Sequence, residues 1–479
     1  MHHLRRIGFN TFRPAASYSM IAPGFRPVEA RGSRRKATSG KIEGRRMHHD
    51  GDHERHDKRF RLKVRHVVLG VFAALVLAGL LHMAILSSGA NRRIEALRAA
   101  GQPTSLAELS VRNKLPMGME NAAPLYESAF AAYVPPGEDV NVPFIGRKTV
   151  PLPRGTMLSG PMAQVVADCL AANEKCLALL HQASAIETCR YEYEYGKASP
   201  KYDKVRSCAH LLKLAAVQHA CKGETEAVVG CLKDTLCLAA SLRQEPTLMP
   251  YLMHTAINGS TLRTLEWALN LTAFTDSQLQ DLDATLADAA GKTNLAYAMA
   301  TERCFMIDAV RDPSLMGSQG PEVRIVMFPG IRSQGLIDIL DYMGDCIQAA
   351  GLPRSERAAK FDEIETRRQK LPKWHVLAHV LAPALSRISI LDSRAQADMD
   401  LARIALAAER YRLAKGKLPE QLTDLVPTYL DQVPIDPFDG QPIRYRRTEP
   451  GYILYSVRED GQDNGGKEQH EVGKGEPYD

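Results

Sequence analysis

The chain has 479 residues, of which 45% are hydrophobic, 24% are charged and 6% are aromatic, and its formal net charge is +6. These proportions exclude a wholly disordered protein, and a multi-span membrane protein would be far more apolar. At roughly 150 residues per domain the length allows about three domains. The low aromatic content and the long helical stretches predict a mainly α protein rather than an all-β sandwich or barrel.

The first 65 residues are strongly basic, with 17 Lys and Arg against 6 Asp and Glu. Such an arm suits either nucleic acid or anionic lipid. Because it stops at an apolar run, we expect lipid headgroups rather than nucleic acid as its contact. We predict residues 1–65 to be a disordered cytoplasmic tail. Two alternatives stay open for its first part, an organelle transit peptide and a translation start at Met47.

The apolar run extends from Val67 to Leu86, and no Asp, Glu, Lys or Arg occurs between positions 66 and 91. At 1.5 Å per residue such a run reaches about 30 Å, the thickness of a bilayer's hydrocarbon core. We therefore predict a transmembrane helix over 66–88 that acts as a signal-anchor. A buried helix of a globular domain fits less well, because such a helix usually turns one polar face to water. In this run only His82 and the small residues could do so. A cleavable signal peptide has a shorter apolar stretch, of about 7–15 residues.

Basic residues crowd the N-terminal side of this run, namely Arg59, Arg61, Lys63 and Arg65. Positive charge beside a span is retained in the cytoplasm. The sequence thus predicts a single-pass protein of the inner (cytoplasmic) membrane, with a cytoplasmic N-terminus and a periplasmic C-terminal part.

Residues 89–390 are predicted to be a helical ectodomain interrupted by Gly- and Pro-rich loops. Ser105–Glu108 and Thr275–Gln278 have the spacing of capping boxes. The segments Leu211–Ala220 and Glu226–Leu242 predict a helical hairpin that resembles one tetratricopeptide-type unit. A stacked array needs at least about three units, and the sequence has no regular repeat.

The sequence offers little support for catalysis. It has no nucleophile elbow, phosphate-binding loop or dinucleotide fingerprint. His375 and His379 share one helix face, but Val376 stands where a zinc protease needs Glu, so core or membrane-surface histidines are favoured over metal ligands. The nine cysteines include no Cys-x-x-Cys pair. We interpret them as small buried side chains with one or two bridges among them, and a zinc or redox site is the alternative.

Residues 391–466 are predicted to be a small α+β module. Ala397, Leu401, Ile404 and Ala408 form an apolar stripe on one helix, which ends near Gly416. A short second helix, a turn-rich segment and two strand-like runs follow. The turn Glu449-Pro450-Gly451 between these runs predicts a β-hairpin, and residues 467–479 are predicted to be disordered.

This module resembles the globular end of type II secretion major pseudopilins. The resemblance rests on Ala408-Glu-Arg-Tyr-Arg-Leu413, Gly416, Leu418-Pro419, Pro434-Ile-Asp-Pro-Phe438, Tyr445, Tyr455-Ser456, Asp460-Gly461 and Gly465-Gly466. The whole layout, with Asn121-Ala-Ala-Pro-Leu-Tyr126 and Cys189-Arg190, is similar to uncharacterised single-pass membrane proteins of planctomycete-like bacteria. In pseudopilins the anchor runs straight into this module, whereas here it lies far upstream and lacks the family's cleavage motif.

The resemblance implies a calcium site in the loop after the last strand, because pseudopilins bind calcium there. Asp460, Asp463 and Asn464 would be its ligands, and calcium the one expected cofactor. Calcium takes about six to eight oxygen ligands. A soluble acidic turn without metal remains the alternative, since Arg458 and Lys467 flank the loop.

These features favour a membrane-anchored periplasmic binding or scaffolding protein over an enzyme. Its expected partners are the lipid bilayer and other envelope proteins. A membrane-anchored hydrolase and a component of a type II secretion-like apparatus are the alternatives.

Overall fold

The computed structural model describes residues 7–9, 53–138, 140–145, 152, 155–192, 202–291, 294–316, 328–375, 378–379, 385–449 and 451–467. All other residues, among them most of the predicted basic tail and residues 468–479, lie outside the described residues. The chain divides into two compact units, Phe12–Ile85 and the combination of Met1–Thr11 with Leu86–Asp479. Helix α1 begins in the first unit and ends in the second.

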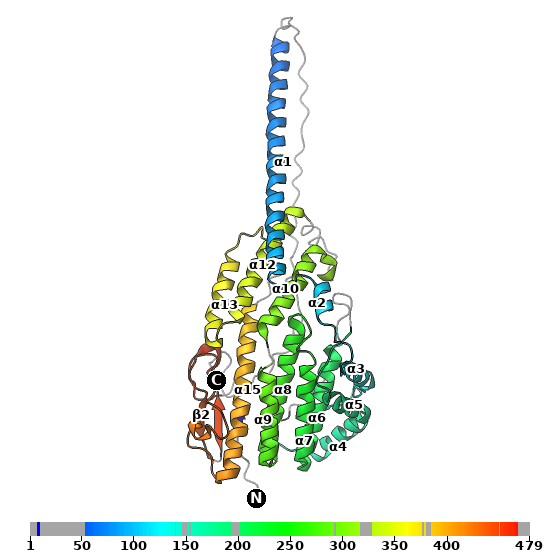
Figure 1. Cartoon of the computed structure of the whole chain (residues 1–479), viewed down its shortest axis with the longest axis vertical. Coiled ribbons are helices and arrows are strands. Elements are labelled where there is room, and N and C mark those ends of the chain that lie inside the picture. Colours follow the sequence, from blue (N-terminus) through cyan, green and yellow to red (C-terminus); the bar gives the residue numbers. More distant parts are fainter. Residues whose placement is uncertain are drawn as a thin grey trace, which may run out of the picture. The chain divides into compact units, whose positions relative to one another are not determined.

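The fold is mainly helical, as predicted (Figure 1). The α-helices are α1 (His53–Ala99), α2 (Leu106–Arg112), α3 (Ala123–Ala132), α4 (Gly160–Ala171), α5 (Glu174–Ser184), α6 (Tyr202–Lys222), α7 (Thr225–Ala240), α8 (Leu248–Leu271), α9 (Asp276–Gly291), α10 (Leu295–Arg311), α12 (Pro329–Ala350), α13 (Arg354–Gln369) and α15 (Leu385–Lys415). The short 3-10 helices are η1 (Pro313–Met316), η2 (Leu422–Leu425) and η3 (Arg458–Asp460). The strands are β1 (Ile7–Phe9), β2 (Arg444–Arg447) and β3 (Tyr452–Tyr455).

Helix α1 contains the predicted span and extends beyond it at both ends. The stretch Val64–Ala99 is long and apolar enough to cross a membrane. Every residue from Val67 to His82 is exposed. Residues 53–65, which belong to the predicted disordered tail, are helical.

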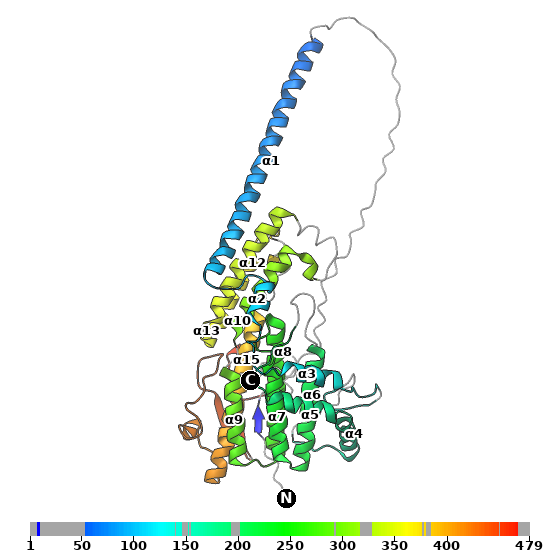
Figure 2. The same cartoon turned by 45° about the vertical axis from the view of Figure 1, so that its right-hand side comes forward.

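The helices of the second unit pack around three large apolar cores. One core joins α3, α4, α5, α6 and α7. A second joins α7, α8 and α9 to α15 and the sheet. The third joins α10, α12 and α13 to the end of α1, where Ala90 and Ile94 are buried. Helices α8 and α15 contact strand β1, and α15 also contacts β3. Figure 2 shows β1 as a short blue arrow in the lower part of this unit.

Local sequence signals predict several helix ends correctly. Thr275 Oγ1 accepts from the Gln278 backbone N–H at 3.3 Å, and Gln278 Oε1 accepts from the Thr275 N–H at 3.0 Å, so the predicted capping box is confirmed. Glu108 reaches back one residue further than predicted, to the Thr104 N–H at 2.8 Å. The predicted helical hairpin is α6 and α7, joined at Gly223, whose φ of 75° favours glycine.

Two sequence motifs that lie far apart along the chain contact each other. Asn121 donates through Nδ2 to the Arg190 carbonyl at 2.9 Å, and its Oδ1 accepts from the Arg190 N–H at 2.9 Å. Ala122 N–H donates to the Thr188 carbonyl at 2.9 Å. The amide of Asn121 therefore fastens the segment after α5 to the start of α3.

All nine cysteines are free thiols, and Cys176, Cys189, Cys208, Cys304 and Cys346 are buried. The sulfur atoms of Cys176 and Cys208 approach to 3.9 Å between α5 and α6. Five of the nine are thus buried as predicted and four are half-buried, and the predicted bridges are not formed among these nine.

The C-terminal part is built on α15, whose apolar stripe faces the second core. Ala397, Leu401, Ile404 and Ala408 are fully buried, and the helix ends at Lys415 before Gly416, whose φ is 69°. The helix begins at Leu385, so the predicted module boundary between 390 and 391 falls inside it. The predicted short second helix is the 3-10 helix η2.

The three strands form one sheet in the order β1-β3-β2. Strands β2 and β3 pair antiparallel, with Arg444 opposite Tyr455, which confirms the predicted hairpin. Strand β1, from the segment predicted to be disordered, pairs parallel to β3, with Phe9 opposite Leu454. A parallel partner from the opposite end of the chain carries no local sequence signal.

Candidate metal-binding site

The loop predicted to hold calcium follows β3 and folds back over it. It comprises residues 456–466 and contains η3 and three glycines with positive φ. A Cβ on Gly466 would lie 2.9 Å from Cδ1 of Tyr455 and 3.1 Å from Cγ2 of Ile453. Only glycine therefore permits the loop to lie this close to the strand.

The structure brings two of the three predicted ligands together. Asp460 Oδ1 accepts from the Gln462 N–H at 3.0 Å, and its Oδ2 accepts from Nδ2 of Asn464 at 3.1 Å. Asn464 thus directs its donor, not its oxygen, at the carboxylate. Coordination of a cation by both residues requires the Asn464 amide to turn over.

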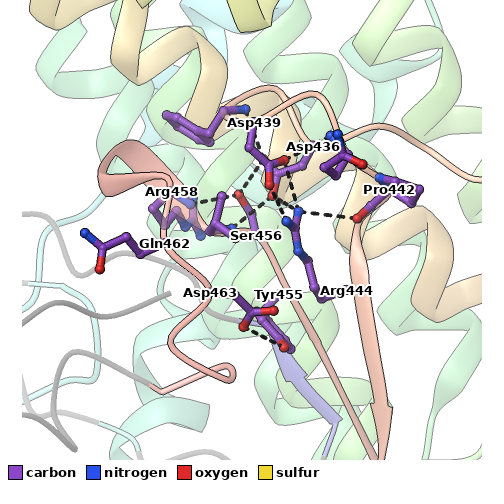
Figure 3. Close-up of polar contacts among 12 residues, drawn as sticks. Asp436, Asp439, Pro442, Arg444, Tyr455, Ser456, Arg458, Gln462 and Asp463 are labelled. Atoms are coloured by element: carbon purple, nitrogen blue, oxygen red, sulfur yellow. Dashed lines mark hydrogen bonds and ion pairs between the residues drawn. The ribbon is translucent and has the colours of Figure 1, made fainter.

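The third predicted ligand contacts the strand instead. Asp463 Oδ1 accepts from the Tyr455 hydroxyl at 3.0 Å and from the Gly465 N–H at 2.9 Å (Figure 3). Asp460 and Asp463 are both exposed. Among the described residues, no three His, Cys, Asp or Glu side chains gather in a way that would hold a metal. Calcium at this loop remains a prediction, and it requires backbone and amide oxygens.

One predicted obstacle to calcium is smaller than expected. The side chain of Arg458 is buried and donates to Oδ1 of Asp398 on α15 at 2.8 Å. Its φ of 57° is unusual for a residue with a side chain. Because Asp398 balances its charge inside the protein, Arg458 does not present a cation to the exposed face of the loop.

Beside the loop lies a buried carboxylate that the sequence alone does not single out. Asp436 is fully buried. Its oxygens accept from Phe438 N at 3.1 Å, Ser456 Oγ at 3.0 Å, Val457 N at 2.9 Å and Nη1 of Arg444 at 3.2 Å (Figure 3). The carboxylate therefore joins the turn before β2 to the end of β3.

The same arginine is held by a second carboxylate. Arg444 pairs with Asp439, with Nη1 at 3.1 Å from Oδ1. Burial alone would raise the pKa of Asp439, but the hydrogen bonds from Arg444 and from the Gln441 N–H lower it overall. The hydrogen bond between the two side chains also raises the pKa of Arg444. With four donors on Asp436 and an ionised neighbour, this cluster is a structural brace rather than an acid–base site.

The two histidines considered as metal ligands have separate partners. His375 Nδ1 lies 2.6 Å from Oδ2 of Asp338, and His379 Nε2 lies 3.2 Å from the Leu371 carbonyl oxygen. Their rings are thus engaged by different groups, which favours the structural interpretation over zinc.

One group has the residue types of a hydrolase triad but not its geometry. Ser184 donates to Oδ1 of Asp234 at 2.5 Å, and His181 Nδ1 lies 3.1 Å from Oδ2 of the same carboxylate. A triad requires the serine to donate to the histidine. Here both side chains bind Asp234, so the serine is not activated.

Compared with models of protein families, with curated proteins and with solved structures, the chain matches none of them. The chain's own residues are therefore the basis on which its function is inferred.

Proposed function

We propose that the protein is a single-pass, membrane-anchored protein whose C-terminal part serves as a binding or scaffolding surface in the periplasm. The exposed apolar stretch of α1 carries this proposal. Eleven of its large apolar side chains are 46–68% exposed, among them Val67, Phe72 and Leu77. Burial stabilises each such side chain by roughly 1.5–3 kcal/mol. Lipid offers this burial along the whole stretch.

The charge pattern supports the orientation. The basic residues that precede Val67 favour retention of the N-terminal side in the cytoplasm. The bulk of the chain then faces the periplasm of a cell with two membranes.

A binding or scaffolding role fits the polar groups better than hydrolysis does. The buried carboxylates Asp436, Asp392 and Asp398 each pair with an arginine, and Ser184 donates to Asp234 rather than to a histidine. A role within a type II secretion-like apparatus rests on the resemblance of the C-terminal module alone. For this reason a role in a type II secretion-like apparatus ranks second to a general binding or scaffolding role.

Two measurements test the proposal. The protein should remain in the membrane pellet after alkaline carbonate extraction. Alkaline phosphatase fused after Asp479 should be active, and green fluorescent protein fused there should be dark, if that end lies in the periplasm. A soluble protein, or the reverse pattern of the two reporters, overturns the proposal.

A further inference from the structure

Strand β3 has one edge that β2 does not cover. At the turn of the hairpin, Thr448 and Gly451 exchange two backbone hydrogen bonds, at 2.8 and 2.7 Å. In an antiparallel pair such bonding positions recur at every second residue, and on β3 the next one is Ile453. The backbone N–H and C=O groups of Tyr452 and Leu454 therefore point away from β2, toward the other edge.

Both faces of β3 are already covered by the protein. Tyr452 and Leu454 are 1% and 0% exposed, and they belong to the core that contains the apolar stripe of α15. On the opposite face, a Cβ on Gly466 would lie 3.1 Å from Cγ2 of Ile453, so the loop after the strand lies tightly against it. Backbone groups enclosed in this way need hydrogen-bond partners. The second edge of β3 is therefore suited to pair with another strand.

In the structure this strand is β1, which runs parallel to β3 and contacts α8 and α15. Residues 7–9 precede α1 along the chain, whereas β3 follows it. If α1 crosses a membrane once, the two strands lie on opposite sides of the bilayer. The same holds for β1 of every other copy inserted in that orientation, so a second copy does not supply the strand either.

The register of β1 describes the kind of segment that fits this edge. Residues opposite each other on neighbouring strands share one face of the sheet. The two apolar residues of β1, Ile7 and Phe9, stand opposite the core-facing residues of β3, and Gly8 stands opposite Ile453. A segment with two apolar residues on either side of a small one therefore matches the edge.

We propose that this edge of β3 is the docking site for an extended segment of another protein on the same side of the membrane, which adds to the sheet parallel to β3. The backbone of the segment bonds to Tyr452 and Leu454, and its apolar residues at alternate positions share the core face of the sheet. Recognition by strand addition works in this way. The docking site rests on the membrane crossing proposed above, and it gives the binding role a defined surface.

A peptide with the sequence of residues 4–12 serves as the probe, because its middle three residues pair with β3 in the structure. The labelled peptide is added to the full chain in nanodiscs, and fluorescence anisotropy measures binding. A control peptide carries N-methylglycine at the position of Gly8, which removes one backbone donor and changes no side chain. A second protein, which lacks residues 2–11, has no β1 of its own. Hydrogen exchange with mass spectrometry locates the contact.

We expect the peptide to bind both proteins equally, to slow exchange of the Leu454 amide, and to bind about tenfold more tightly than the N-methyl peptide, which lacks one hydrogen bond. Absence of binding, equal binding of the two peptides, or protection away from residues 452–455 overturns the docking site. Binding to the shortened protein alone means that β1 occupies the edge in the inserted chain, which overturns the docking site and the crossing together. The reporter fusions after Asp479 test the crossing by itself, so they separate the failure of one proposal from the failure of both.

Discussion

Helices α1 and α15 are both long, but α1 exposes apolar side chains to solvent whereas α15 buries charged side chains inside the protein. In α1, no charged residue occurs between positions 66 and 91, and the apolar side chains are exposed. In α15, Asp392, Asp398 and Glu409 are buried among apolar neighbours, and each is paired with an arginine. A helix tolerates buried charge only where protein supplies partners. The comparison therefore separates a helix that is long and apolar enough to cross a membrane from one made for a protein core, although both are rich in Leu and Ala.

The largest expected effect follows from placing charged residues in the apolar stretch of α1. Leu77→Arg with Leu80→Arg places two cations at the middle of the exposed stretch. Each arginine opposes insertion by about 2.5–3.5 kcal/mol on translocon scales. We expect the protein to move from the carbonate-resistant pellet to the soluble fraction, whereas Leu77→Ala with Leu80→Ala stays in the pellet. Unchanged membrane retention of the arginine variant would contradict a span at this position.

The next effect comes from removing a buried carboxylate beside α15. Asp436→Ala leaves the buried Val457 N–H and the Ser456 hydroxyl without their acceptor, at about 1–3 kcal/mol each, while Arg444 keeps Asp439 as its carboxylate partner. Urea unfolding of the detergent-solubilised protein, followed by circular dichroism, measures the loss. The exposed Asp463→Ala is the matched control, with an expected change below about 1 kcal/mol. Equal stability of the two variants would rule out the bracing role of Asp436.

The sequence predicts features that depend on neighbouring residues, but not contacts between residues that are far apart along the chain. The stripe of α15, the Thr275 cap and the β2–β3 hairpin follow from spacing within a few residues, and all are confirmed. Asp436 is visible only as part of a turn between two prolines, because its partners Val457 and Arg444 are chosen by the fold. Likewise Asp392 binds Tyr251 at 2.5 Å and Arg357 at 2.7 Å across three helices. One sequence shows no pairing over such separations.

On α15, Asp400 differs from the carboxylates that pair with arginines, and this difference predicts a pH-dependent change in the free energy of unfolding. Burial, opposed by Gln396 and nearby arginines, raises the pKa of Asp400 to about 6 from an ordinary value of 3.8. The folded state then holds a proton that the unfolded state has lost between these pH values. Stability falls as pH rises through this window, and the penalty is complete above about pH 6.

Asp400→Asn should therefore stabilise the protein by about 3 kcal/mol at pH 7.5, since one pKa unit corresponds to about 1.4 kcal/mol, and the gain should vanish near pH 3.5. Urea unfolding at both pH values measures it. A gain that is equal at the two pH values would mean that the ionisation of Asp400 is not its cause.

A smaller effect is expected from calcium at the exposed loop that Arg458 fastens to α15. Calcium at ten times its dissociation constant stabilises a folded protein by about 1.4 kcal/mol. We expect the detergent-solubilised protein to release or absorb heat with millimolar calcium, and Asp460→Ala with Asp463→Ala to abolish that heat. Absence of heat with the unaltered chain would leave the loop an acidic turn without metal.

The smallest expected effect concerns strand β1, because its pairing with β3 conflicts with a membrane-spanning α1. Phe9 pairs with Leu454, yet a chain that crosses a bilayer once through α1 has residues 9 and 454 on opposite sides. The β1–β3 pair and a membrane-spanning α1 therefore exclude each other within one molecule. Proline removes the backbone donor of a strand residue.

In nanodiscs we expect Phe9→Pro to leave stability within about 0.5 kcal/mol of the unaltered chain, and the register partner Leu454→Pro to lower it by about 3 kcal/mol or more. Urea unfolding of both variants provides the comparison. A large loss with Phe9→Pro in the lipid-embedded protein would mean that β1 reaches β3 after insertion. The N-terminal segment would then lie on the same side as the sheet, and α1 would have to enter and leave the membrane on one face rather than cross it.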